Sequence, residues 1–433
     1  MRKLIWKIKA SLRKLAPPRV IRTYHFSTAL IGAFLYGFPS SKLTVIAVTG
    51  TKGKSSTTEM INAIFEEAGQ KTALMNSIRF KIDADSRPNE LRMSMPGRLF
   101  IQNFLNEAVA AKCTVAILEM TSEGAQQFRH RAIALDALVF TNLAPEHLES
   151  HGSIEAYADA KYEIGRQLRR SSKRPRIMVA NADDTQGSRY LTLGVEYALP
   201  FSLAGCAPYE SDDHGGHFHF DDTDVAIHLP GDFSLRNAIA AATLAQALGI
   251  KTPVIAKALG KLARIPGRAE RIEAGQSYAV VVDYAHTPDS LTALYDAYGT
   301  PPSTGLGTSR RLICVLGSTG GGRDLWKRPV MGSIADARCD EVILTNEDPY
   351  DEDPRSIVDS LASGMKRSPT IIMDRRGAIA KAISLAKPGD AVLITGKGTD
   401  PNICGPRGTK TPWSDARVAR EELEKASRAP AAV

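Results

Sequence analysis

The stretch TGTKGKSST at residues 49–57 decides the fold, because it stands between two segments of different periodicity. Residues 41–48 (SKLTVIAV) are rich in Val and Ile and predict a buried strand, whereas Met60 and Ile64 lie at the spacing of a helix. A glycine-rich turn between strand and helix presents several backbone N–H groups to one point, where the helix dipole also favours an anion. The segment therefore predicts a phosphate-binding loop.

This loop differs by one residue from the usual phosphate-loop pattern, in which a glycine stands where this chain has Val48. The flanking strand and helix nevertheless provide the context that the motif requires. Lys54 is expected to reach the terminal phosphates, and the Ser55 hydroxyl to bind Mg²⁺. The residues predicted to contact ATP here are Gly50, Thr51, Lys52, Gly53, Lys54, Ser55 and Ser56.

Apolar strands and helical patterns alternate along the rest of the chain, which predicts an α/β fold. Residues 43–266 are expected to form a P-loop-type central domain with a mainly parallel sheet. The alternation restarts at Gly267, so residues 267–433 are expected to form a C-terminal Rossmann-like α/β domain, and residues 1–42 form a short basic segment. The expected strands after the loop are residues 115–118, 137–140, 177–179, 278–282, 312–316, 341–344 and 391–394.

Composition agrees with a folded chain of two or three domains: 433 residues, 43% hydrophobic and 24% charged. The five cysteines are scattered and never form a CxxC pair, so neither a disulfide framework nor a thiolate zinc site is expected. This cysteine pattern is typical of a reducing cytoplasm. The segment 211–224 (SDDHGGHFHFDDTD) collects His and Asp, and we interpret it as a polar hairpin rather than a metal site because its spacing fits no structural metal motif.

The net charge of +8 is concentrated at the N-terminus, where residues 1–22 hold eight Lys and Arg and no acidic residue precedes Glu59. The rest of the chain is near neutral, which argues against a nucleic-acid partner. Leu4, Ile8, Leu12 and Leu15 recur at helical spacing, as in a helix on an anionic membrane surface; a basic helix packed on its own protein fits equally well. The apolar run 26–38 is shorter than the ~20 residues of a spanning helix.

The loop resembles the ATP loop of the Mur ligases, the ATP-dependent amide-forming enzymes of peptidoglycan synthesis, and that of the related folylpolyglutamate synthases. Three later stretches, EMTS (119–122), TNLAPEHLESHG (141–152) and YADAK (157–161), are similar to the tripeptide synthetase branch of the Mur ligases. The resemblance implies that Glu119 and His147 ligate Mg²⁺ and that Lys161 is carbamylated, its new carboxylate holding a second Mg²⁺. Carbamylation turns a cation into the hard oxygen ligand that Mg²⁺ prefers.

Two stretches of the second half, GRAER (267–271) and VDYAHTPDSL (282–291), resemble tripeptide synthetases, whereas folylpolyglutamate synthases usually have DGAHNP at the latter. The resemblance implies that Asn237 lies by the adenine, Arg268 by the phosphates, Asp283 by the ribose and His286 near the nucleotide. Arg268 or Asp283 taken alone would fit a salt bridge at the domain boundary.

The stretches GGGRD (320–324), NEDPYDEDP (346–354) and GKGTD (396–400) resemble the amino-acid pocket of the family. The implied contacts are Arg323 with the α-carboxylate, Glu347 and Asp400 with the ammonium groups, and Asp348 and Gly396 beside them. Ligases that add meso-diaminopimelate usually have Asp-Asn-Pro-Arg where this chain has Glu347-Asp348-Pro349-Tyr350. The loss of that arginine favours an amino acid with a terminal amine, such as lysine or ornithine.

The resemblance implies a UDP-MurNAc-peptide acceptor that contacts Thr121, Gln127 and Arg129, which fall at the family's offsets after Glu119. It also implies a contact with Ser94, in a Ser-Met-Pro stretch (94–96) that stands where Thr-Thr-Pro is usual. Glu123 replaces the common histidine, and the ~45 residues before the loop are about half the length of the usual uridine-binding domain.

The sequence thus predicts a monomeric cytoplasmic ligase that forms an acyl phosphate with ATP and Mg²⁺, with Lys54, Glu119, His147 and Lys161 as catalytic residues. Two alternatives stay open: an amide ligase of the folylpolyglutamate or cyanophycin type, and a noncatalytic relative that binds nucleotide.

Overall fold

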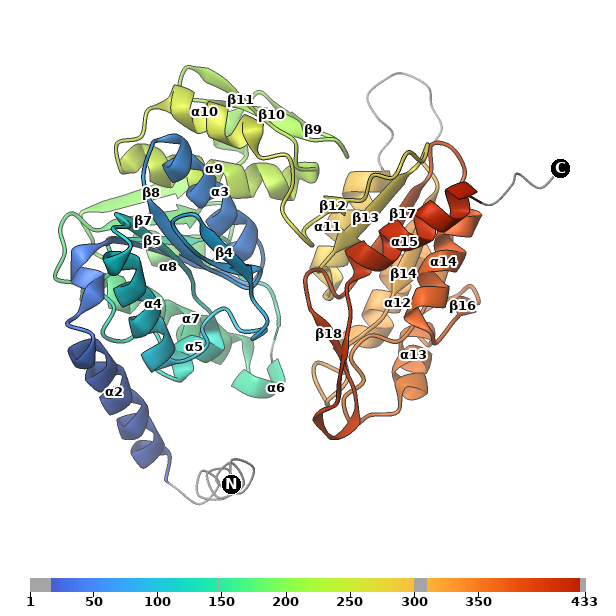
Figure 1. The fold of residues 1–433 in the computed structure, drawn as a ribbon, viewed down its shortest axis with the longest axis horizontal. Coiled ribbons are helices and arrows are strands. Elements are labelled where there is room, and N and C mark those ends of the chain that lie inside the picture. The colour runs from blue at the N-terminus through green and yellow to red at the C-terminus, as the bar shows by residue number, and fades with distance from the viewer. Residues whose placement is uncertain (1–16, 147, 300–309, 429–433) are drawn as a thin grey trace.

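The computed structural model describes residues 17–146, 148–299 and 310–428. Figure 1 shows two sheets side by side, each covered by helices. The first has eight strands in the order β4-β3-β2-β5-β1-β6-β7-β8. Its strands are β1 (Thr44–Thr49), β2 (Thr72–Met75), β3 (Arg79–Ile82), β4 (Asp85–Pro88), β5 (Val115–Glu119), β6 (Ala137–Phe140), β7 (Ile177–Asn181) and β8 (Tyr197–Phe201).

This first sheet is mainly parallel, as predicted. Only the pairs β2–β3 and β3–β4 run antiparallel. Strand β1 lies in the interior between β5 and β6, and both pairings are parallel. The loop after β1 therefore stands at the carboxyl edge of the sheet, between two strand ends, where open α/β sheets bind their ligands.

Alternating side chains of each strand explain why helices cover both faces of the first sheet. Ile46 and Val48 pack into one apolar cluster, with α3 (Lys54–Glu67), α9 (Gly231–Ala247) and α10 (Thr252–Lys261). Val45 and Ala47 pack into the other, with α4 (Arg98–Ala110), α7 (Ile154–Arg169) and α8 (Gly187–Leu191). Two short helices, α5 (Ser122–Gln126) and α6 (Leu148–His151), follow β5 and β6.

The second sheet has six strands in the order β12-β13-β17-β14-β15-β16, and only β12–β13 is antiparallel. Helices α11 (Pro288–Gly299), α12 (Lys327–Arg338) and α13 (Pro354–Ala362) cover one face, and α14 (Arg375–Leu385) and α15 (Asp415–Arg428) cover the other. The predicted second α/β unit is confirmed. Its strands are β12 (Glu270–Arg271), β13 (Ala279–Asp283), β14 (Leu312–Leu316), β15 (Glu341–Leu344), β16 (Thr370–Ile371) and β17 (Ala391–Thr395).

Smaller antiparallel pieces complete the fold. The polar segment 211–224 joins β9 (Tyr209–Ser211), β10 (Gly216–Phe220) and β11 (Thr223–Ile227), so the predicted hairpin is confirmed. Within the described parts of the chain, no three His, Cys, Asp or Glu side chains are grouped to hold a metal. Strands β18 (Asn402–Cys404) and β19 (Lys410–Pro412) pair beside the second sheet.

The N-terminal region differs in detail from the prediction. Strand β1 begins at Thr44 because residues 39–42 form a 3-10 helix, η1 (Pro39–Lys42), that starts at a proline. The apolar run 26–38 lies largely in α2 (Pro18–Leu35). Among the described residues, no helix combines the length and the apolar character needed to cross a membrane. The predicted pattern from Leu4 to Leu15 lies outside the described residues.

One cysteine pair corrects the sequence prediction. Cys314 of β14 and Cys339 at the end of α12 form a disulfide, whereas Cys113, Cys206 and Cys404 are free and buried. The expectation of no disulfide is wrong for this pair, because α12 packs on the face of the sheet that carries Cys314. The sequence separation of 25 between the two cysteines hides this proximity.

Candidate functional site

The phosphate loop depends on two glycines. Gly50 and Gly53 have φ angles of +148° and +80°, which a residue with a side chain rarely adopts. A Cβ at Gly50 would lie 1.9 Å from Thr141 Oγ1, and one at Gly53 would lie 2.2 Å from Asn237 Oδ1. The loop is therefore closely packed against Asn237 of α9, the residue that was predicted to lie by the adenine.

Two buried lysines meet on a single carbonyl of this loop. Lys54 Nζ donates to Gly50 O at 3.0 Å and to Thr51 O at 2.9 Å, and Lys161 Nζ donates to the same Gly50 O at 2.7 Å. Burial lowers the pKa of both amines, and the charge of Lys54 lowers the pKa of Lys161 further. Lys161 is thus more readily neutral than an exposed lysine, and a neutral amine is the form that reacts with CO₂.

Oxygen ligands gather around Glu119 at the end of β5. Ser55 Oγ donates to Glu119 Oε2 at 2.8 Å, and Ser94 Oγ donates to Oε1 at 2.7 Å. Hydroxyl and carboxylate oxygens are the hard ligands that suit Mg²⁺, so this donor set fits that ion. His147, the other predicted metal ligand, lies outside the described residues.

Glu146 is a buried site residue that the sequence interpretation missed. Its Oε1 accepts from Lys52 Nζ of the loop at 3.1 Å and lies 3.0 Å from His286 Nε2, which belongs to the second α/β unit. Glu146 therefore joins the phosphate loop to the opposite side of the site. Its position directly before His147, after the end of β6, was the available signal.

The second α/β unit contributes an arginine to the loop. Arg268 Nη2 donates to Ser55 Oγ at 3.2 Å and to Ser77 Oγ at 3.1 Å, while its guanidinium lies over the Tyr284 ring at 4.6 Å. Asp283 accepts from the backbone N–H groups of Ala269 and Ala285, each at 2.6 Å. Asp283 thereby holds the segment that carries Arg268, and burial raises its pKa.

These residues line a cleft of about 910 Å³ between the two α/β units. The four residues predicted for the acceptor line the same cleft: Ser94, Thr121, Gln127 and Arg129. Thr121 Oγ1 accepts from Gly124 N at 3.1 Å and so caps α5, and Arg129 donates to Gln127 Oε1 at 2.8 Å and also to Met95 O. Other predicted residues on the lining are Thr51, Lys52, Gly53, Lys54, Ser55, Ser56, Glu119, Lys161, Asn237, Arg268, Asp283, His286 and Arg323.

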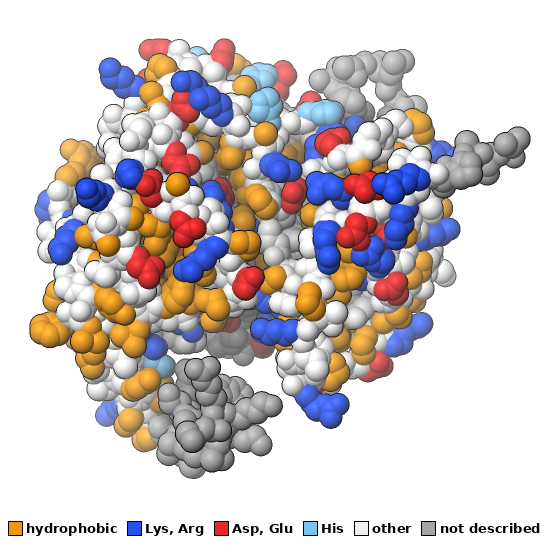
Figure 2. Space-filling view, viewed as in Figure 1, with side chains coloured by type: hydrophobic (Ala, Val, Ile, Leu, Met, Phe, Trp, Pro, Cys, Tyr) orange, Lys and Arg blue, Asp and Glu red, His pale blue; other side chains and the backbone are white. Residues whose placement is uncertain are grey.

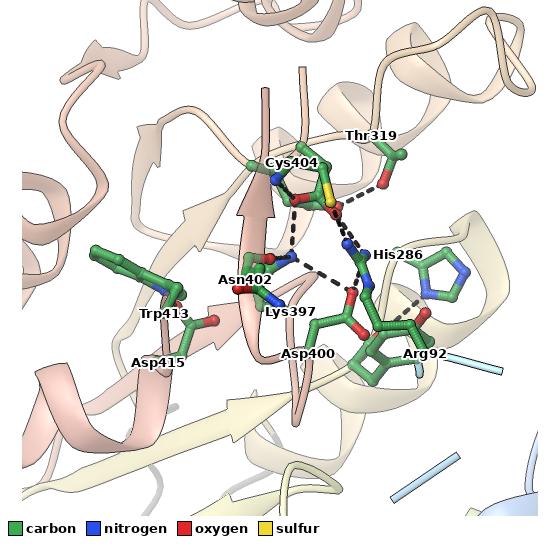
Figure 3. A network of polar contacts seen from close by, with 12 residues as sticks. Arg92, His286, Thr319, Lys397, Asp400, Asn402, Cys404, Trp413 and Asp415 are labelled. Atoms are coloured by element: carbon green, nitrogen blue, oxygen red, sulfur yellow. Dashed lines mark hydrogen bonds and ion pairs between the residues drawn. The ribbon is translucent and has the colours of Figure 1, made fainter. Parts of the chain in front are cut away.

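A network of ion pairs lies at the end of the second sheet, and Figure 3 shows it from close by. Asp348 Oδ1 accepts from Lys397 Nζ at 2.9 Å and from Cys404 N at 2.7 Å. Asp348 Oδ2 accepts from Arg92 Nη2 at 2.7 Å, and Arg92 also donates to Asp400 Oδ2. Arg92 comes from the loop after β4 in the first unit, so it ties the two units together across 256 residues of sequence.

Glu347 differs from its neighbour Asp348. Its Oε1 accepts from Thr319 Oγ1 at 2.7 Å, whereas the buried Oε2 accepts no hydrogen bond from any described residue. Gly396, with a φ of +106°, packs against this oxygen, and a Cβ there would lie 2.1 Å from it. Burial raises the pKa of Glu347. One carboxylate oxygen thus has no hydrogen-bond partner among the described residues, and Glu347 is 2% exposed and not on the lining of the cleft.

Arg323 lies on the same side of the cleft, and its guanidinium stands over the Tyr350 ring at 5.4 Å. Tyr350 is the residue that replaces the arginine of the diaminopimelate-adding pattern. The structure therefore brings together the loop with its lysines, Glu119, Arg268 and Arg323 on one cleft. The other amino-acid-binding candidates, Glu347, Asp348, Gly396 and Asp400, are not on the lining of this cleft.

A phosphate loop with two buried lysines and hard oxygen ligands, facing a second α/β unit with acidic side chains, is the layout of an ATP-dependent acid–amino-acid ligase. The Mur ligase middle domain matches residues 48–245, and the Mur ligase, glutamate ligase domain matches residues 267–398. The chain belongs to the Mur ligase family.

Two relatives illustrate this membership. The chain is 36% identical over 408 residues to the UDP-N-acetylmuramoyl-L-alanyl-D-glutamate–2,6-diaminopimelate ligase of Syntrophomonas wolfei, covering 91% of this chain and 81% of that protein. It is 35% identical over 421 residues to the UDP-N-acetylmuramyl-tripeptide synthetase of Roseiflexus sp., covering 91% and 81%.

Solved structures are similar as well. A UDP-N-acetylmuramoyl-L-alanyl-D-glutamate–2,6-diaminopimelate ligase superimposes with a TM-score of 0.60 at 28% identity, covering 89% of this chain and 79% of that one. The folylpolyglutamate synthase of Mycobacterium tuberculosis has a TM-score of 0.68 at 17% identity, covering 87% and 93%. The likeness to the latter is one of fold alone.

Proposed function

We propose that this chain joins an amine of a diamino acid to the carboxylate of a UDP-MurNAc-dipeptide, in the cytoplasmic synthesis of peptidoglycan precursors. The observation that carries the proposal is that Glu119 and Arg268 both contact Ser55 from opposite sides of one cleft, whose lining also includes Lys54. The names of the relatives point to the same acceptor. The acceptor residues Ser94, Thr121, Gln127 and Arg129 lie beside this convergence.

The reaction has two steps. A carboxylate oxygen of the acceptor attacks the γ-phosphorus of ATP, the bond to the β-phosphate oxygen breaks, and ADP and an acyl phosphate result. The amine of the amino acid then attacks the acyl carbon and loses a proton, and phosphate leaves from the tetrahedral intermediate. The chain's own contribution is to hold three substrates in line and to place cations near the transferred phosphoryl group.

Three groups of residues have separate tasks in this scheme. Lys54 at the loop and Arg268 across the cleft neutralise phosphate charge. Ser55, Glu119, His147 and a carbamylated Lys161 would hold Mg²⁺, which when bound supplies further charge neutralisation. Asn237, Asp283 and His286 would orient the nucleoside, and exclusion of water from the cleft would protect the acyl phosphate from hydrolysis.

The amino acid is proposed to end in an amine, as lysine and ornithine do. Arg323 would grip its α-carboxylate, and Glu347, with its unpartnered oxygen, would accept from an ammonium group. Asp348, Gly396 and Asp400 would complete the pocket. Tyr350 supplies no cation for a distal carboxylate, which is why lysine is favoured although the relatives are named for 2,6-diaminopimelate.

The direct test is to incubate the protein with ATP, Mg²⁺ and UDP-MurNAc-L-Ala-D-Glu, to offer each diamino acid separately, and to weigh the products by mass spectrometry. The expected product carries lysine or ornithine, and a product formed only with meso-diaminopimelate would correct the proposed amino acid. Turnover with folate or polymer acceptors alone would favour the other amide ligases. Nucleotide binding without phosphate release for any acceptor would indicate a noncatalytic relative.

A further inference from the structure

Helix α2 is anchored to the first α/β unit by one face only. His25, Ala29 and Ala33 on this face are 7%, 1% and 0% exposed. The small residues allow close packing on α4, because a Cβ at Gly32 would lie only 3.1 Å from Leu99 Cδ2. This packing fixes which side of α2 points away from the protein.

The outward side of α2 is apolar. Val20, Tyr24, Ile31, Phe34 and Leu35 are 56%, 58%, 53%, 75% and 67% exposed. Their spacing places them along a single stripe of the helix. Figure 2 shows hydrophobic side chains gathered at the lower left, where α2 lies in Figure 1. A continuous exposed apolar stripe of this kind marks an interaction surface.

The charged residues of α2 and of the sequence before it are all basic. Residues 1–22 hold eight Lys and Arg, Arg19 and Arg22 lie in α2 itself, and no acidic residue occurs before Glu59. Outside residues 1–22 the chain has 55 − 8 = 47 basic and 47 acidic residues, so its remainder carries no net negative charge. A second copy of the chain would therefore bring like charges together without compensation.

We propose that the apolar stripe of α2, with Arg19 and Arg22 of the same helix beside it, docks on an anionic lipid bilayer. Such a surface satisfies both features at once, because apolar side chains enter the boundary between headgroups and acyl chains while Lys and Arg meet the lipid phosphates. Docking is peripheral, since α2 stays packed on α4. The proposal does not depend on the ligase reaction, and the two are tested by separate measurements.

The test uses the full-length protein in a co-sedimentation assay with vesicles. Vesicles of phosphatidylcholine with phosphatidylglycerol should bind the protein at least about tenfold more tightly than phosphatidylcholine alone, and added salt should weaken binding. The double variant Phe34→Ser/Leu35→Ser should lose about tenfold or more in affinity for the anionic vesicles, because two apolar side chains no longer leave water. The double variant Arg19→Gln/Arg22→Gln should also weaken binding to the anionic vesicles, by about threefold to tenfold, and should reduce the effect of salt.

The matched control is Tyr197→Ser, which removes a 53% exposed aromatic residue from β8, outside α2. It should bind vesicles as the unmodified chain does, and all variants should keep the same melting temperature and ATP turnover. The proposal is overturned if the unmodified chain stays in solution with anionic vesicles, or if Tyr197→Ser loses as much affinity as the double variant. It is equally overturned if the double variant only converts a dimer to a monomer, because the stripe then joins two copies.

Discussion

The two ends of the cleft are built in different ways. At the loop end, the contacting groups follow neighbouring strands: Lys54 and Ser55 follow β1, and Glu119 ends β5, which pairs with β1. At the far end, Asp348 and Asp400 of the second unit are held by Arg92, which comes from the loop after β4 in the first unit. The proposed phosphate contacts thus depend on a local motif, whereas the acidic network depends on how the two units meet.

The largest expected effect is at the loop end. Lys54→Ala should reduce amino-acid-dependent ADP release by on the order of 10³-fold, because it removes a buried cation beside the loop that is proposed to hold the phosphates. The melting temperature should stay close to that of the unmodified protein. The control is Lys257→Ala, which breaks an exposed ion pair with Glu67 and should leave turnover unchanged. Near-normal turnover of Lys54→Ala would remove the basis for the assignment.

The second effect concerns Lys161. Because burial lowers its pKa, the amine is neutral at a lower pH than an exposed lysine, whose pKa is about 10.4. A carbamate signal should therefore appear in ¹³C NMR spectra with ¹³CO₂ at neutral pH and fade as the pH falls and the amine is protonated. Lys161→Ala should lose the signal and about 10²-fold or more in turnover, with partial recovery in formate or acetate. Full activity without any carbamate signal would contradict this role.

The third effect tests the far end. Glu347→Gln should raise the KM for the amino acid by about tenfold to a hundredfold, because a hydrogen bond to a charged group contributes about 1.5–3 kcal/mol. The KM for ATP should stay unchanged. In the unmodified enzyme, protonation of Glu347 should raise the KM for the amino acid as the pH falls. Because burial raises the pKa of Glu347, this rise should begin at a higher pH than it would for an exposed glutamate. If the KM of Glu347→Gln still rose as the pH falls, another titrating group would be responsible for the rise.

The same contrast explains what the sequence could predict. Both sheets, the loop and the position of Glu119 follow from short motifs and from strand periodicity, because residues near one another in the chain determine them. Glu146 was missed because its burial depends on Lys52 and His286 meeting it from other segments. Arg92 was missed for a stronger reason: no local pattern marks a side chain whose partners lie 256 and 308 residues away. Lys397 was missed because its burial depends on Asp348, which lies 49 residues before it. The Cys314–Cys339 disulfide was hidden in the same way.

The smallest expected effect concerns Arg92, and it would sharpen the contrast most. Its guanidinium holds Asp400, the carboxylate proposed to face an ammonium group of the substrate, so the two cations compete for one partner. Arg92→Met should therefore lower the KM for the diamino acid by about threefold to tenfold with little change in the KM for ATP, whereas Arg92→Lys should stay near the unmodified value. Steady-state kinetics with lysine as the varied substrate measure this. A KM that rises in Arg92→Met would show that the arginine supports amino-acid binding, and the far end would then require both units to form its pocket.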